Sequence, residues 1–295
     1  MKKILIVGGT SLLGKYLNLT KPDEVDLYQT WYTNVNSGLP MLQMDICNKS
    51  QVAYIFERVK PEVVIHCSAV GSVDYTETHY NETQMVNVFG MENILRAAKD
   101  HKALFVYIST NAVFEGSNPP YSEESGRIPI NRYGSLKRQA EDSVMTSKNW
   151  LIIRPFLLYG WPYPGGRQNW VTTILTKLKL GQPARLVDDV WWMPTHAVDM
   201  AEVVWKLIEL SQPEQVYNVA TDDRMTLYRF GLSVVKVWGL DKKLIEPIAS
   251  ESLRGIARRP VDTSYDLTKI KELGLRLSSV EEGLNNMKDW YKNEL

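Results

Sequence analysis

The sequence predicts an α/β protein built on a doubly wound parallel sheet, with a smaller, discontinuous domain in its C-terminal part. Short apolar runs recur along the 295 residues, bounded by charge or glycine, as in strands that are buried on both faces. Amphipathic helical patterns lie between several of these runs. Strands that alternate with helices are typical of a parallel sheet covered by helices on both sides.

Most of the predicted strands lie in the first half of the chain. The apolar runs are assigned to strands at 4–7, 25–28, 63–66, 104–108, 151–153 and 216–219. Helices in this half are predicted at 51–59, 83–99 and 132–145. In the first of these, Val52, Ile55, Phe56 and Val59 fall on one stripe, which is the spacing of a helix that packs on a sheet.

The pattern changes after Arg154, where residues 155–166 are irregular and rich in proline, glycine and aromatic side chains. Beyond them, the sequence predicts helices at 171–180, 197–210 and 227–238, and two short amphipathic segments within 258–295. We therefore expect one domain over residues 1–154, to which segments near 195–220 return. A smaller cap is expected, made mainly of residues 155–295.

Composition excludes several classes of protein. Hydrophobic residues make up 44% of the chain and charged residues 23%, as in ordinary globular proteins. Thirty-four basic residues balance 34 acidic ones, which argues against a nucleic-acid partner. The apolar runs are too short for a membrane span, and the run Ile4 to Val7 is too short for a signal peptide. Cys47 and Cys67 lack a metal-ligand spacing, so we expect a cytoplasmic protein without a metal site, a disulfide or a membrane partner.

A glycine-rich turn follows the first predicted strand and opens a helix. Its spacing is G-x-x-G-x-x-G from Gly8 to Gly14, with Ser11 in the place of the middle glycine. Such a turn lets the backbone approach a pyrophosphate, which then lies on the helix N-terminus. The turn predicts a Rossmann-type, NAD(P)-binding domain over residues 1–154, although an ordinary strand-to-helix turn is the alternative.

The end of the second strand bears on the choice of cofactor. A carboxylate usually holds the ribose 2′-hydroxyl of NAD there, and residues 28–34 contain none. A 2′-phosphate would not be repelled, which favours NADP(H) over NAD(H), but no arginine stands there to bind it. Residues 44–46 are predicted to end the third strand, and Asp45 among them either reaches the adenine amino group or caps the helix before Gln51.

Two helical residues form a candidate acid–base pair. Tyr133 and Lys137 are four positions apart, so they share one face of the predicted helix. An ammonium near a phenol lowers the phenol pKa, which makes Tyr133 a candidate general acid or base. Thr110 ends a buried strand, where ligands bind in parallel sheets, and its hydroxyl can bond a substrate carbonyl beside Tyr133.

Together these residues resemble the extended short-chain dehydrogenases/reductases, and more narrowly the dTDP-4-dehydrorhamnose reductases. Residues 109–116 resemble the S-T-D-Y-V-F-D-G of these reductases, and residues 120–124 resemble their P-Y-x-E-x. Further likenesses are found at Val73 to Glu77, at Val187 to Asp199 and at Arg259-Pro260 with Leu267. The resemblance therefore runs nearly the whole length of the chain.

The resemblance implies hydride transfer from NAD(P)H to C4 of a nucleotide-linked 4-keto-6-deoxy sugar. Tyr133 would protonate the developing alkoxide, Lys137 would lower the tyrosine pKa and hold the nicotinamide ribose, and Thr110 would polarise the carbonyl. Asn87 either supports Lys137 through water or is a polar residue on a helix face. A homodimer that pairs through the helices at about 83–99 and 132–145 is also implied.

The expected site follows the carboxyl edge of the sheet. Cofactor contacts are expected from Gly8, Thr10, Ser11, Leu12, Leu13, Gly14, Thr30, Asp45, Ile46, Cys67, Ser68, Ala69, Asn87, Tyr133, Lys137 and Phe156. Substrate contacts are expected from Val73, Asp74, Asn111, Asn169 and Arg259.

The chain departs from the pattern where relatives approach the sugar. Asn111-Ala112 replaces Asp-Tyr, and Leu157 stands where relatives carry a tryptophan that lies against the sugar. Trp191-Trp192, with Trp161 and Trp170 near them, could stack on a sugar or base, or could belong to the core of the cap.

Three other functions compete with the reductase. A nucleotide-sugar 4-epimerase uses the same three residues with tightly held NAD. A 4,6-dehydratase is disfavoured, because Asn111-Ala112 supplies no carboxylate. The regulatory β subunit of methionine adenosyltransferase belongs to the same family, resembles this chain around residues 118–121, and acts by binding a partner.

Overall fold

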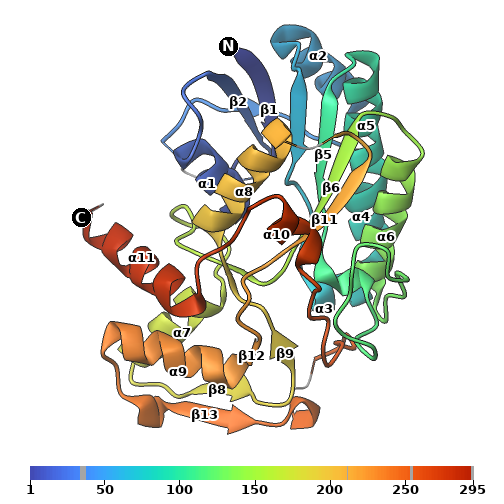
Figure 1. Cartoon of the computed structure of the whole chain (residues 1–295). Coiled ribbons are helices and arrows are strands. Elements are labelled where there is room, and N and C mark those ends of the chain that lie inside the picture. The colour runs from blue at the N-terminus through green and yellow to red at the C-terminus, as the bar shows by residue number, and fades with distance from the viewer. Residues whose placement is uncertain (34–37, 211, 253–254, 294–295) are drawn as a thin grey trace.

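A computed structural model of the chain describes residues 1–33, 38–210, 212–252 and 255–293. Its centre is a seven-stranded sheet in the order β11-β6-β5-β4-β1-β2-β3, in which every neighbouring pair is parallel (Figure 1). The strands are β1 (Lys2–Val7), β2 (Val25–Trp31), β3 (Leu42–Gln43), β4 (Val63–His66), β5 (Leu104–Ile108), β6 (Trp150–Pro155) and β11 (Gln215–Val219). The strand order reverses between β1 and β4, and the carboxyl ends of the strands at such a reversal are where the ligand crevice of these sheets lies.

Both faces of this sheet are buried. The side chains of β1 alternate, so that Ile4 and Ile6 join one apolar cluster while Leu5 and Val7 join another. The first cluster is completed by α1 (Leu12–Leu19), α8 (Ala197–Leu210) and α10 (Thr268–Glu272). The second is completed by α2 (Lys49–Val59), α5 (Met91–Asp100) and α6 (Arg132–Met145). This is the expected α/β architecture with helices on both sides.

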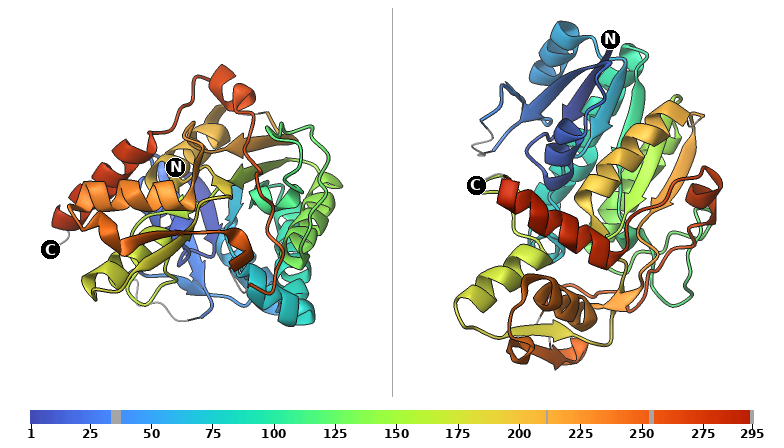
Figure 2. Two further views of the ribbon diagram at one scale, coloured as in Figure 1. Left: turned by 90° about the horizontal axis from the view of Figure 1, so that it is seen from below. Right: turned by 60° about the vertical axis from the view of Figure 1, so that its left-hand side comes forward.

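A smaller unit forms the cap below the carboxyl edge (Figure 1). Its core contains Ile174, Phe230 and Leu284. Its elements are α7 (Trp170–Lys179), β8 (Ala184–Val187), α9 (Leu227–Trp238), β13 (Ile245–Ile248) and α11 (Val280–Asn293). In Figure 2, α11 lies between the sheet unit and the cap, where it packs on α9. None of the described helices has the length and apolar character needed to cross a bilayer.

Two-residue strands join the parts together. They are β7 (Leu158–Tyr159) with β10 (Thr195–His196), and β9 (Trp191–Trp192) with β12 (Met225–Thr226). Residues 255–267, which we call the C-terminal strap, run from the cap back to the sheet unit. The strap is held by bridges that pair Tyr265 with Tyr121 and Asp262 with Trp191.

Several predicted bounds coincide with the structure, including the strands at 63–66 and 104–108 and the helices at 132–145, 197–210 and 227–238. The third strand was placed too late, because β3 ends at Gln43. The chain turns at Asp45 instead, where a carboxylate oxygen accepts the Cys47 N–H at 2.8 Å. The helix predicted at 83–99 is α4 (Tyr80–Gln84) and α5, joined by a π-helical turn over Met85–Gly90.

Candidate active site

The glycine turn packs tightly against its neighbours. Gly8 has φ +88°, and a Cβ there would lie 2.8 Å from the Ser68 nitrogen, while a Cβ on Gly14 would lie 2.6 Å from the Gly8 carbonyl oxygen. Thr30, at the end of β2, holds the turn through its carbonyl oxygen, which accepts the Gly9 N–H at 2.8 Å. Only glycine fits these two positions, so the turn brings bare backbone to the edge of the crevice.

The first turn of α1 is open to a ligand. Ser11 caps the helix by accepting the Gly14 N–H at 3.0 Å, whereas the earlier N–H groups of a helix have no partner within it. These donors and the helix dipole suit a phosphate. The turn therefore fits the pyrophosphate of a nicotinamide dinucleotide, with Thr10, Leu12 and Leu13 beside it.

The end of β2, where a carboxylate would hold the ribose 2′-hydroxyl of NAD, has no carboxylate among the described residues. Asn34, the last residue of the predicted stretch 28–34, lies outside the described residues. Asp45 does not cap α2, as one reading expected. Asn48 does so, accepting the N–H groups of Ser50 and Gln51 at 3.1 Å each. The Asp45 carboxylate instead holds the turn after β3, next to buried Ile46.

Thr110 ends the segment that follows β5. Its hydroxyl oxygen accepts the Ala112 N–H at 3.2 Å and lies 3.4 Å from the Asn111 side-chain oxygen. The hydroxyl therefore accepts one bond and donates a long one to the Asn111 amide oxygen, which a carbonyl oxygen in the crevice can replace. The Asn111 amide donates to Thr263 of the strap at 2.7 Å, so Asn111 connects Thr110 with the strap.

A glycine brings α6 against the segment that carries Thr110. Gly134 lies in the first turn of α6, where a Cβ would overlap the carbonyl oxygen of Ala112. Asn131 caps this helix by accepting the Gly134 N–H at 2.8 Å. The close approach places Tyr133, which is half-buried, within reach of the Thr110 hydroxyl.

We expect Gly134→Ala to lower both stability and activity, because the added methyl group meets backbone that cannot move without displacing Thr110. Overpacking of this kind typically costs about 1–3 kcal/mol. Ser135→Ala, an exposed change one residue later, is the matched control. Chemical denaturation would measure the loss, and equal stability of the two variants would contradict this account of the glycine.

Lys137 is buried one turn after Tyr133. Its ammonium donates to the Ile108 carbonyl oxygen at 2.8 Å and lies 4.2 Å from the centre of the Tyr107 ring. Burial lowers the Lys137 pKa to about 7, although the charge of Glu141 acts in the opposite direction. The lysine therefore changes charge near neutral pH.

The pKa of Tyr133 differs from the expectation that Lys137 lowers it. Burial raises this pKa above its usual value, and the hydrogen bond with Thr110 and the charge of Arg167 only partly oppose that effect. A phenol with a raised pKa stays protonated at neutral pH, so Tyr133 is ready to act as an acid.

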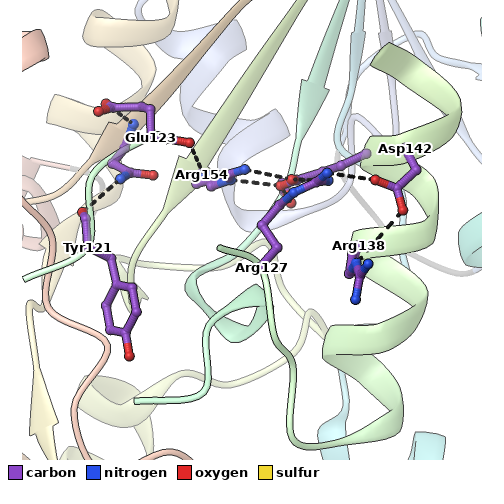
Figure 3. Close-up of polar contacts among 9 residues, drawn as sticks. Tyr121, Glu123, Arg127, Arg138, Asp142 and Arg154 are labelled. Carbon is purple, nitrogen blue, oxygen red and sulfur yellow. Dashed lines mark hydrogen bonds and ion pairs between the residues drawn. The ribbon is translucent and has the colours of Figure 1, made fainter. Parts of the chain in front are cut away.

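A buried ion pair fixes α6 against the sheet. Glu141 accepts two hydrogen bonds from Arg154 of β6, at 2.9 and 2.8 Å, and one from Ser109 at 2.5 Å. Arg127 adds a further bond at 3.1 Å and also bonds Asp142, as Figure 3 shows. Burial raises the Glu141 pKa, but the bonds and charge of Arg154 outweigh it and hold that pKa below its usual value. The pair ties Ser109, next to Thr110, to the helix that carries Tyr133 and Lys137.

Asn87 lies in the π-helical turn, and its side chain bonds the backbone of Val70. Its side chain accepts the Val70 N–H at 2.8 Å and donates to the Val70 carbonyl oxygen at 3.1 Å. It thus holds the segment after β4, which carries the expected cofactor residues Cys67, Ser68 and Ala69. No direct bond joins it to Lys137 among the bonds of the described residues.

The chain matches a known family over nearly its whole length. The family model described as the RmlD substrate binding domain matches residues 1–293. The chain belongs to this family. The sheet order, the glycine turn and the Thr110–Tyr133–Lys137 group are thus features of an RmlD-family member.

Relatives in this family carry different names. The dTDP-4-dehydrorhamnose reductase of Bacillus anthracis, solved in complex with NADP, superposes with a TM-score of 0.87 at 29% identity over 97% of this chain and 99% of that chain. The spore coat polysaccharide biosynthesis protein SpsK of Bacillus subtilis is 29% identical over 96% of both chains. Methionine adenosyltransferase 2 subunit beta of Xenopus laevis is 26% identical over 93% of this chain and 83% of its own length.

Some expected ligand residues have structural contacts in this member of the RmlD family. Asn169 caps α7 and donates to the Gly160 carbonyl oxygen at 2.6 Å. Phe156 is buried against Trp192 and Tyr265. Trp161 donates to the Met287 carbonyl oxygen at 2.7 Å within the cap. These contacts favour core and capping roles for the three residues.

Two expected substrate residues fasten the strap. Asp74, next to Val73 at the start of α3 (Val73–Thr78), binds Arg259 at 2.6 Å and accepts the Ala257 N–H at 3.0 Å. The Asp74 pKa is lowered, first of all by this hydrogen bond from Arg259. The pair closes one end of the crevice by joining strap and sheet unit.

Sequence reasoning missed the role of the P-Y-x-E motif. The Tyr121 hydroxyl accepts the N–H groups of Gly116 and Asn118, at 3.0 Å each. Glu123 accepts the Asn218 N–H of β11 at 2.8 Å, and its carbonyl oxygen accepts from Arg154 (Figure 3). The motif therefore holds the loop after Thr110 to the last strand of the sheet, a contact that only the fold brings about.

Proposed function

We propose that the protein is an NAD(P)H-dependent reductase of a nucleotide-linked 4-keto-6-deoxy sugar, similar to dTDP-4-dehydrorhamnose reductase. The observation that carries this proposal is the gathering of Thr110, Tyr133 and Lys137 where β5 ends and α6 begins, beside the glycine turn. The likeness of the whole chain to the B. anthracis reductase supports it.

The cofactor would lie along the carboxyl edge of the sheet. Gly8 to Gly14 would hold its pyrophosphate, Thr30 and Asp45 would flank its adenosine half, and Lys137 would hold the nicotinamide ribose. When bound, the nicotinamide supplies the hydride for the ketone carbon. The absence of a carboxylate among the described residues at the end of β2 favours NADP(H) over NAD(H).

Each of the three residues has one task. Thr110 turns its hydroxyl hydrogen from the Asn111 amide oxygen to the ketone oxygen and draws charge onto it. Tyr133 transfers its proton to that oxygen as the alkoxide develops, since its raised pKa keeps it protonated at neutral pH. Lys137, held by the Ile108 carbonyl oxygen, stabilises the phenolate that is left.

The test mixes purified protein anaerobically with dTDP-4-keto-6-deoxyglucose, a 3,5-epimerase and either NADPH or NADH. We expect the nicotinamide absorbance to fall, faster with NADPH. No oxidation by either cofactor contradicts the proposed substrate. A bound cofactor that survives purification, with no net oxidation, indicates a 4-epimerase instead.

The adenosyltransferase relatives favour a second candidate, a subunit that regulates a partner. Its test mixes the chain with a methionine adenosyltransferase catalytic subunit and measures binding and activity. A stable complex with altered activity, together with no ketone reduction, would support this candidate over the reductase.

We expect the reductase rate to fall as pH rises through about 7, because Lys137 loses its proton there. The titratable groups around it change charge elsewhere. Burial lowers the His66 pKa to about 3, raises the Cys67 pKa to about 12 and raises that of Tyr107 well above 10, while the Glu141 pKa is held low. A pH–rate profile measures this, and a flat rate between pH 6 and pH 8 on that profile contradicts the role of Lys137.

A further inference from the structure

A loop of the cap lies against α1 and comes close to the segment that follows β4. Residues 160–169 form this loop, which is closed at its base by the bond from Asn169 to the Gly160 carbonyl oxygen. The loop is anchored on α1, where the Trp161 N–H donates to the Tyr16 hydroxyl at 2.8 Å and buried Tyr163 lies under the Lys15 ammonium. These contacts fix the loop beside the glycine turn.

Arg167 is an exposed residue of this loop. Its guanidinium rests against Gly71, where a Cβ would lie 2.9 Å from the Arg167 Nη1. Gly71 follows β4 at the carboxyl edge of the sheet, and the charge of Arg167 acts on the Tyr133 phenol. One guanidinium from the cap therefore faces the catalytic side of the crevice.

The positive charge of Arg167 is not neutralised by the protein. Within residues 1–33, 38–210, 212–252 and 255–293, it has no hydrogen bond or ion pair. Arg259 and Arg132, by contrast, are each paired with a carboxylate, Asp74 and Glu77 respectively. An exposed guanidinium beside Gly71 at the carboxyl edge of the sheet, without a carboxylate bound to it among the described residues, can bind an anion of the ligand.

We infer that Arg167 binds the diphosphate of the nucleotide-linked substrate. The inference rests on the proposed function, because it takes the ketone to lie at Thr110 and Tyr133. The anomeric phosphate is then one sugar ring away from the reacting carbon, on the side that the cap loop covers. A guanidinium offers a planar pair of donors that suits two phosphate oxygens.

The cofactor is the other source of a diphosphate near this loop. Its pyrophosphate fits the first turn of α1, whose helix donors already supply an anion site. Arg167 contacts Gly71, on the far side of the reversal in strand order from β2. The position therefore favours the substrate, and binding to each ligand separates the two sources.

Calorimetry of the full chain with dTDP, thymidine and NADPH tests the inference. We expect Arg167→Gln to weaken dTDP binding at least tenfold, while thymidine and NADPH bind as in the original protein. The dTDP affinity of Arg167→Lys should lie between those of Arg167→Gln and the original protein, since a lysine is a single point charge. Arg185→Gln, which changes an exposed cap arginine paired with Glu246, should leave dTDP affinity unchanged.

Equal dTDP affinity in the Arg167→Gln variant and the original protein overturns the inference while leaving the reductase proposal standing. A loss confined to NADPH also overturns it, because the arginine then serves the cofactor. If the original protein binds none of dTDP, UDP and GDP, both the nucleotide-linked substrate and the role of Arg167 are wrong.

Discussion

Tyr133→Phe is expected to slow ketone reduction by about 10²- to 10⁴-fold, the usual size of a general acid's contribution. The change removes one oxygen from a half-buried ring and leaves the backbone of α6 in place. Lys137 keeps its bond to Ile108, so cofactor affinity should change little. The effect therefore falls on the chemical step alone.

A neighbouring tyrosine provides the control. Tyr107 is buried under Lys137, and its hydroxyl has no hydrogen-bond partner among the residues that the structure describes. Tyr107→Phe therefore removes an oxygen without breaking a described hydrogen bond. Single-turnover oxidation of NADPH would compare the two variants, with cofactor titration alongside. If Tyr133→Phe keeps most of the rate, another group supplies the proton.

Glu141→Gln is expected to lower the free energy of unfolding by about 3–5 kcal/mol, the cost of breaking a buried ion pair from one side. Arg154 is 1% exposed, so its charge would remain in the interior without a carboxylate. The Lys137 pKa would fall further, because Glu141 now raises it. The fall of rate with pH should therefore begin at a lower pH in this variant.

Two variants separate the ion pair from the site around it. Asp142→Asn changes the next residue, whose pairs with Arg127 and Arg138 lie at the surface, and should cost less than about 1 kcal/mol (Figure 3). The double change Glu141→Gln with Arg154→Met removes both charges and should restore part of the lost stability. Denaturation by urea measures the free energy of unfolding of all three variants. Equal losses of stability in Glu141→Gln and Asp142→Asn would contradict the stabilising role of the buried ion pair.

The large sheet could be predicted because its strands carry their own signal. The run Val63 to Ile65 in β4 is apolar throughout, since both faces of the strand are covered. The two-residue strands carry no such signal. Trp191 and Trp192 form a strand only because Met225 and Thr226 come to lie beside them, and no local pattern predicts that pairing.

The candidate site also has a part that the sequence predicts and a part that only the fold reveals. Thr110, Tyr133 and Lys137 were found because each lies at a fixed place on a predictable strand or helix. The partnership of Glu141 with Arg154 depends on how α6 lies on β6, and the position of Arg167 depends on a loop without periodicity. The raised pKa of Tyr133 could not be foreseen either, because it follows from burial rather than from the spacing to Lys137.

The strand order also determines when the sheet can be completed during synthesis of the chain. The outer edge of β6 is completed only by β11, which is made after α7, α8 and the first half of the cap. Lys269 of α10 then bonds Gln215 of β11 at 3.0 Å, so the cover over that strand comes later still. Until then the nascent chain presents an unpaired apolar edge, the kind of surface that chaperones shield and that pairs with other chains. The sheet unit is thus continuous in its first six strands, yet its edge at β6 is still unpaired when the chain has reached residue 155.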